Sequence, residues 1–168
     1  RRAIELLGDT REPVLCTYRA SAEAYLAELL LEIDDIRGAQ EHVTLAKLFA
    51  ERSRQPRAQV RAMLAEGQVE VRAGLADIGL TRLKNGLSST RAGPKEFLRD
   101  ALAAAVRGYE EAGQPDVAIV YLQELLNLNR EAKQQQADEA KPFMGGLSAE
   151  VGRTLGPNGE HARLSGAI

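Results

Sequence analysis

Helix-breaking glycines recur along this 168-residue chain at nearly regular intervals, and this spacing restricts the folds that are open to it. Gly38, Gly74 and Gly113 each follow a long segment rich in Leu, Ala, Glu, Arg and Gln, which are strong helix formers. They lie 36 and 39 residues apart. Helix pairs that repeat at such a period stack on one another, because one pair cannot bury its apolar surface alone. The spacing therefore predicts an all-α array of antiparallel helix pairs.

Apolar periodicity and breaker residues predict where the helices of this array lie. In the first of them, Tyr25, Leu29 and Ile33 belong to an apolar stripe at helical spacing, which predicts its buried face. Gly38 is expected to end this helix. The six predicted helices cover residues 13–37, 39–54, 56–74, 75–87, 95–112 and 115–136.

The chain divides near residue 136 into two segments of different character. Residues 1–136 are predicted to form the helical repeat domain. Residues 137–168 are predicted to form an irregular tail or linker with at most one short helix, because Pro142, the pair Gly145-Gly146 and a run beginning at Gly156 interrupt the pattern. The chain starts with Arg and not Met, so we expect a piece of a longer protein with flanking domains.

Charge and composition argue against several classes of partner. The chain carries 22 Lys and Arg against 24 Asp and Glu, a balance that disfavours binding to nucleic acid or to an anionic membrane. No run of about 18 apolar residues predicts a membrane span. The only cysteine, Cys16, fits a reducing compartment, so the sequence predicts a cytoplasmic location.

Small residues within the predicted helices point to a known repeat family. Residues 60–91 resemble a degenerate tetratricopeptide repeat, with Gly67, Gly74, Gly79 and Gly86 at its small-residue places. Small residues there let two helix backbones approach closely. The next unit places Leu102, Tyr109, Gly113 and Ala118 at motif positions. The resemblance spans about residues 20–132 and is similar to the looser repeats of bacterial regulators of the maltose-activator type. It implies a right-handed superhelix of about three repeats.

The resemblance also implies a binding surface, because such arrays bind protein segments or small effectors on a concave face formed by the first helix of each pair. The Lys/Asn clamp that holds a peptide carboxylate in many of these arrays has no counterpart in this sequence. The alternative is that the charges at these positions only solvate helix surfaces. The candidate residues of the concave groove are Glu28, Glu32, Asp35, Arg61, Gln68, Arg72, Arg107 and Glu110.

Catalytic and metal-binding patterns are weak in this sequence. His42 and His161 are its only histidines, too few for a typical metal hydrolase site. Where a His-Asp phosphodiesterase would carry its metal-binding doublet, the chain has Ala76-Asp77. No Walker loop or nucleophile elbow is present. The sequence thus predicts a protein that is not an enzyme and has no cofactor or metal.

One dense basic run, formed by Arg52, Arg54, Arg57 and Arg61, crosses a predicted helix boundary. We interpret it as structural, since cations suit a helix C-terminus, and an anionic partner is the alternative. The whole pattern predicts an interaction or effector-sensing module of a larger bacterial cytoplasmic regulator. A structural spacer or dimerisation scaffold between signalling domains is the competing hypothesis.

Overall fold

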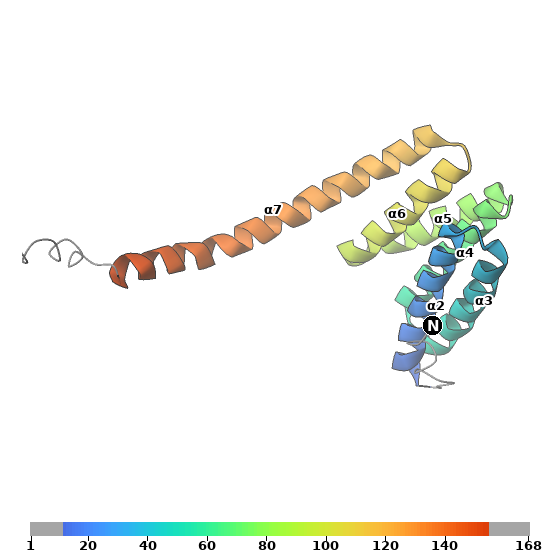
Figure 1. Cartoon of the computed structure of the whole chain (residues 1–168), viewed down its shortest axis with the longest axis horizontal. Coiled ribbons are helices and arrows are strands. Elements are labelled where there is room, and N and C mark those ends of the chain that lie inside the picture. Colours follow the sequence, from blue (N-terminus) through green and yellow to red (C-terminus); the bar gives the residue numbers. More distant parts are fainter. Residues whose placement is uncertain (1–11, 155–168) are drawn as a thin grey trace, which may run out of the picture. The chain divides into compact units, whose positions relative to one another are not determined.

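The computed structural model of the protein describes residues 12–154, with side chains up to residue 140. The predicted all-α class is confirmed for this part of the chain, which contains helices and no strand (Figure 1). The helices are α2 (Pro13–Glu32), α3 (Ile36–Ser53), α4 (Pro56–Arg72), α5 (Ala76–Thr90), α6 (Lys95–Glu111) and α7 (Pro115–Thr154).

The helices pack as successive pairs. Helix α2 contacts α3, and α4 contacts α5, so each helix packs on the one that follows it. Helix α3 also contacts α4, and α5 contacts α6, which joins one pair to the next. In addition, α4 lies against both α2 and α6. Tyr109 of α6 and Tyr121 of α7 bring their ring centroids to 5.4 Å. The first helices of the pairs are therefore neighbours along one side of the stack.

The turns within the pairs each contain one residue with a positive φ angle. Gly74 and Gly113 have φ angles of 85° and 70°, so the prediction that they end helices is confirmed. The prediction for Gly38 is wrong, because the first helix ends before Asp34, which has a φ of 62°. Gly38 lies in the first turn of α3, where its N–H donates to the Asp35 carboxylate at 2.9 Å. Asp tolerates this backbone conformation, and the sequence pattern favoured the nearby glycine instead.

The corrected turn positions show the true period of the fold. Asp34, Gly74 and Gly113 lie 40 and 39 residues apart. Helix α5 also continues to Thr90, beyond the break expected at residue 88. The hydroxyls of Ser88 and Ser89 donate to backbone carbonyl groups four residues earlier, which is compatible with a continuing helix.

The buried face of α2 is opposite to the predicted one. Tyr25, Leu29 and Ile33 are 51%, 63% and 73% exposed. Small side chains, including Ala20 and Ala24, are buried instead. Alanine allows two helices to pack closely because it adds little bulk between the backbones. The large side chains of Tyr25, Leu29 and Ile33 lie on the opposite, exposed side of α2.

Glycines bring α4 and α5 into backbone contact. A methyl group added at Gly79 would lie 2.5 Å from the Gly67 carbonyl oxygen and 2.8 Å from the Val71 backbone nitrogen. A methyl group at Gly86 would meet the Leu64 side chain at 2.7 Å. The predicted close approach of the two backbones is therefore confirmed at Gly67 and Gly79, where no larger residue fits without a shift of the helices. At Gly86 the neighbour is the Leu64 side chain, which would have to move.

Two compact units divide the chain, Arg1–Leu126 and Asn127–Ile168. Helix α7 continues through residues 137–154, which the sequence assigned to an irregular tail. Residues 127–141 are rich in Ala, Glu, Lys and Gln, and these strong helix formers favour the helix without a supporting core. Pro142, Gly145 and Gly146 each lower the stability of this helix, but they do not end it. The remainder of the predicted tail, residues 155–168, lies outside the described part.

Candidate functional site

The first helices of the three pairs, α2, α4 and α6, carry the predicted groove residues. The 40- and 39-residue period places side chains of the three helices in equivalent positions. Two such sets lie across the helices, and we call each set a rung. The upper rung consists of Glu28, Gln68 and Arg107, and the lower rung of Glu32, Arg72 and Glu111.

The upper rung is joined by hydrogen bonds. Arg107 Nη2 donates to Glu28 Oε2 at 3.3 Å. With its amide oriented to suit its neighbours, Gln68 accepts from Arg107 Nε at 3.0 Å and from Nη2 at 2.9 Å. Gln68 is buried, so these bonds satisfy a polar group that has lost its water.

The lower rung is an ion-pair arrangement around one arginine. Arg72 Nη2 lies 2.9 Å from Glu111 Oε1, and its Nη1 lies 3.6 Å from Asp34 Oδ1. Glu32, Arg72 and Glu111 all line a small hollow together with side chains of the upper rung. The C-terminal ends of α2, α4 and α6 lie here, and a cation near helix C-termini is electrostatically favourable.

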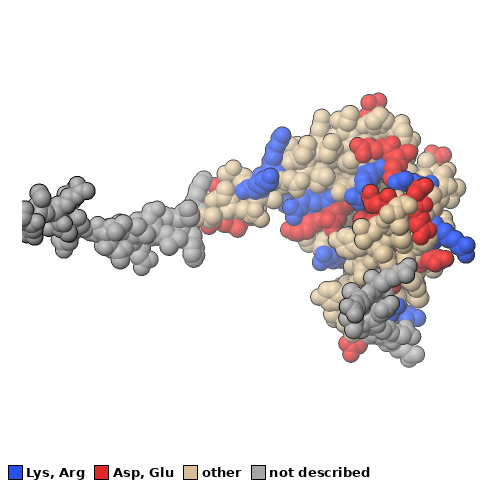
Figure 2. Space-filling view, viewed as in Figure 1, with Lys and Arg blue, Asp and Glu red and all other residues tan. Residues whose placement is uncertain are grey.

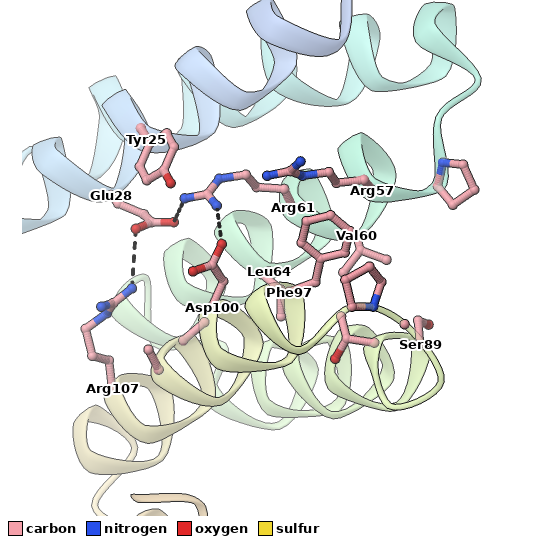
Figure 3. A pocket seen from close by; sticks show the side chains of 16 residues that line it. Tyr25, Glu28, Arg57, Val60, Arg61, Leu64, Ser89, Phe97, Asp100 and Arg107 are labelled. Atoms are coloured by element: carbon pink, nitrogen blue, oxygen red, sulfur yellow. Dashed lines mark hydrogen bonds and ion pairs between the residues drawn. The ribbon is translucent and has the colours of Figure 1, made fainter. Parts of the chain in front are cut away.

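A larger hollow of about 380 Å³ lies between α2, α4 and α6, nearer to the start of α4 and α6 (Figure 3). This volume falls in the range of pockets that hold small ligands. Its apolar lining includes Val60 and Leu64 of α4 and Phe97 of α6. Tyr25 of α2 closes it on another side. The charged side chains that line it are Glu28, Arg57, Arg61, Asp100 and Arg107.

Arg61 occupies the centre of the charged lining. Its Nη1 donates to Asp100 Oδ2 at 2.9 Å, and its Nη2 lies 3.8 Å from Glu28 Oε1. Its guanidinium also stacks 3.5 Å from the Tyr25 ring centroid. The Arg61 side chain is only 14% exposed. These contacts from α2 and α6 hold it in one orientation and neutralise its charge.

Arg57 differs from Arg61 in having no carboxylate partner. Its guanidinium lies 4.1 Å from the centroid of the Phe97 ring, which is a cation–π contact. Among the residues whose side chains are described, no carboxylate lies within ion-pair distance of it. Arg57 is thus an exposed, unneutralised cation at the edge of the larger hollow.

Burial changes the acidity of one groove residue. Desolvation raises the pKa of the Glu28 carboxyl above its ordinary value of 4.5. The positive charges of Arg61 and Arg107 act in the opposite direction, while Asp100 and Glu32 add to the increase. Burial is the largest of these causes, because the ionised Glu28 carboxylate loses part of its hydration on this face.

The structure brings most of the predicted groove residues together. Glu28, Glu32, Arg61, Gln68, Arg72 and Arg107 line one or both hollows. Two predicted residues do not line either hollow. Asp35 is the N-cap of α3 and accepts from the Gly38 N–H. Glu110 is exposed, and its neighbour Glu111 occupies the groove position instead.

Sequence reasoning did not select Arg57 and Phe97 as groove residues. Their contact joins α4 and α6, and no local motif indicates it. The 39-residue offset could have indicated that α4 and α6 are neighbours, since it pairs Arg61 with Asp100 and Arg72 with Glu111, but it does not indicate the contact of Arg57 with Phe97. In the view of Figure 2, basic and acidic side chains are intermixed over the first unit and do not form a large patch of one charge.

Other chemistry-bearing residues lie away from the groove. Cys16 is buried in the core. His42 Nδ1 lies 2.6 Å from Oε2 of the fully buried Glu23, which joins α3 to α2. Within residues 12–140, no three His, Cys, Asp or Glu side chains converge as metal ligands would. None of the helices that the structure describes combines the length and apolar character needed to cross a bilayer.

Comparison with known proteins adds no family to this description. No protein-family model, curated protein or solved structure matches the chain. The resemblance to tetratricopeptide repeats therefore stays a prediction.

Proposed function

We propose that this chain is a non-catalytic recognition module of a larger bacterial cytoplasmic regulatory protein. It binds a partner segment or a small effector on the face formed by α2, α4 and α6. The proposal includes a tetratricopeptide-like, right-handed arrangement of the pairs, with this face as the concave one.

The observation that supports this proposal is the larger hollow on the face shared by three successive first helices. Its apolar lining is open to a ligand, while Arg61, Glu28 and Asp100 are held by one another. Ligand sites commonly combine an apolar surface with a few fixed polar groups in this way. Binding that draws α2, α4 and α6 together would alter the geometry between successive pairs, and this change would be passed to a neighbouring domain.

A peptide library displayed on phage tests the proposal. The full chain is used for selection, and enriched peptides are measured against the variant Arg72→Gln/Arg107→Gln, which alters both rungs. The matched control is Arg37→Gln/Arg54→Gln, which changes two exposed arginines outside the groove. Circular dichroism establishes that both variants are folded.

Enriched peptides that bind wild type and control, but bind the groove variant at least tenfold more weakly, support recognition on this face. Native mass spectrometry of the purified chain applies the same comparison to a retained small effector. If no peptide or retained molecule distinguishes the groove variant from the control, the proposal is overturned in favour of a structural spacer.

A further inference from the structure

We propose that the larger hollow binds a monoanionic carboxylate attached to an apolar body, with the carboxylate on Arg57. This inference rests on the proposed function, because it names the ligand chemistry of the same face. The ligand source is either a free organic acid or an acidic residue beside a bulky apolar residue in a peptide, and the experiment separates the two.

The side chains that line the hollow carry one more positive than negative charge, which favours the binding of an anion. Three arginines line it, Arg57, Arg61 and Arg107, against the two carboxylates of Glu28 and Asp100. Both carboxylates already have arginine partners. Arg61 lies 3.8 Å from the Glu28 carboxylate and 2.9 Å from that of Asp100, and Arg107 lies 3.3 Å from the Glu28 carboxylate. One positive charge therefore remains without a partner within the hollow, and it belongs to Arg57.

The same pairing restricts the ligand to one negative charge. Arg61 is largely buried, and both of its terminal nitrogens lie near carboxylates. A second anionic group placed beside it would face Glu28 and Asp100, and like charges at such distances repel. A carboxylate at the edge of the hollow suits this arrangement better than a phosphate dianion, which would concentrate two charges at one place.

The lining beyond Arg57 suits an apolar body. Phe97 lies against the Arg57 guanidinium, and Val60 and Leu64 continue the apolar surface (Figure 3). Pro94 also lines the hollow. The Phe97 ring holds the arginine side chain beside the hollow, so less conformational entropy is lost when an anion binds. A volume of about 380 Å³ accommodates an aryl or branched alkyl group with its carboxylate.

The test uses the full, ¹⁵N-labelled chain and a panel of aryl and branched alkyl carboxylates of about five to ten carbons, a size that suits a small-ligand pocket. Each acid is paired with its primary amide, which has the same shape and no charge. Amide chemical shifts report binding. The Arg57→Gln variant removes the cation, and Arg54→Gln is the matched control, since Arg54 is an exposed neighbouring arginine outside the hollow.

We expect several acids to bind wild type and Arg54→Gln, while their amides bind at least tenfold more weakly. Arg57→Gln is expected to lose about tenfold or more in affinity for the acids, because a charge-assisted hydrogen bond contributes roughly 1.5–3 kcal/mol. Equal binding of acids and amides, an unchanged affinity in Arg57→Gln, or no binding by any panel member at millimolar concentration would overturn the inference.

A second arm identifies the source of the carboxylate. Blocked hexapeptides carrying Phe-Glu at their centre are compared with Phe-Gln peptides of the same sequence. Binding of the Phe-Glu peptides with dependence on Arg57 assigns the site to a protein partner, and binding of the free acids alone assigns it to an effector. If phage selection yields groove-dependent peptides while neither the free acids nor the Phe-Glu peptides bind in an Arg57-dependent way, the inference fails while the proposed function stands.

Discussion

Helices α2 and α4 hold equivalent places in successive pairs, 40 residues apart, but α4 buries a face that is exposed on α2. On α4, Ala58, Ala65 and Val69 are at most 3% exposed, and they belong to the core cluster that includes the apolar side chains of α3. The equivalent residues of α2, which are Tyr18, Tyr25 and Leu29, are 51–63% exposed. Helix α4 has a preceding helix on this face, and no described helix covers it on α2.

This difference shows that a position's burial depends on the neighbours of its helix and not only on its place in the repeat. Small residues occupy the face where a helix covers α4, and bulky ones occupy the same face where α2 is uncovered. The following substitutions test how far the two helices differ.

The largest effect is expected from making α4 resemble α2. Ala65→Tyr places a phenol ring where the native side chain is 1% exposed, and overpacking of this size is expected to cost about 3 kcal/mol or more. The reciprocal change Tyr25→Ala loses the exposed contact with Arg61 and is expected to cost about 1 kcal/mol or less. Urea denaturation measures both, and equal losses would contradict the comparison.

The next effect concerns the place where the helices of a pair cross. Gly79→Ala forces its methyl group against the Gly67 carbonyl, and we expect a loss of about 2–3 kcal/mol despite the better helix propensity of alanine. In the first pair, Ala27 and Ala39 occupy the equivalent positions, both fully buried. Ala39→Gly should cost only about 1 kcal/mol, mainly through helix propensity. Thermal or urea unfolding that ranks the two variants the other way would show that α4 and α5 can separate freely.

A hydrogen bond between His42 and the buried Glu23 carboxyl group distinguishes the first pair from the second. His42→Ala removes the partner that lies 2.6 Å from the buried Glu23 carboxylate, and we expect a loss of about 2–3 kcal/mol. Glu23→Met introduces the residue that α4 has at the equivalent position, Met63, and removes the buried carboxylate itself. Glu23→Met should lower the free energy of unfolding, measured by urea denaturation, less than His42→Ala does. The reverse order would show that the interaction between Glu23 and His42 itself stabilises the fold.

The smallest effect is a pH dependence at the upper rung. Because the pKa of Glu28 is raised, the native state holds this proton to a higher pH than the unfolded state does. The free energy of unfolding of the wild type should therefore fall, relative to Glu28→Gln, as the pH rises from about 4.5 through the native pKa. Glu28→Gln matches α4, which has Gln68 at this position. Parallel stability profiles from pH 4 to 7 would contradict this prediction.

Several features of the fold could be predicted because their causes are local. Pro56 and Pro115 begin helices, since a proline at the first turn loses no hydrogen bond, and Gly74 and Gly113 end them with positive φ angles. The turn at Asp34 was missed because its φ angle is one that glycine adopts more readily. Because the turn lies at Asp34 and not at Gly38, Asp35 is the N-cap of α3 and does not line either hollow.

The candidate site could be predicted in part. The resemblance to tetratricopeptide repeats placed Glu28, Arg61 and Arg107 on a common face, and the structure joins them through hydrogen bonds and ion pairs. The contact of Arg57 with Phe97 could not be predicted in this way, because it depends on how closely α4 and α6 lie.

The sequence by itself determined the helical class, the approximate period and the glycines at the crossing of α4 and α5, because backbone propensity and side-chain size act locally. Tertiary structure decided which face of α2 is buried and where an unpaired cation meets an apolar hollow. Both outcomes depend on which helices become neighbours. A helix with apolar side chains on two faces can bury either one, and only the packing of the stack selects between them.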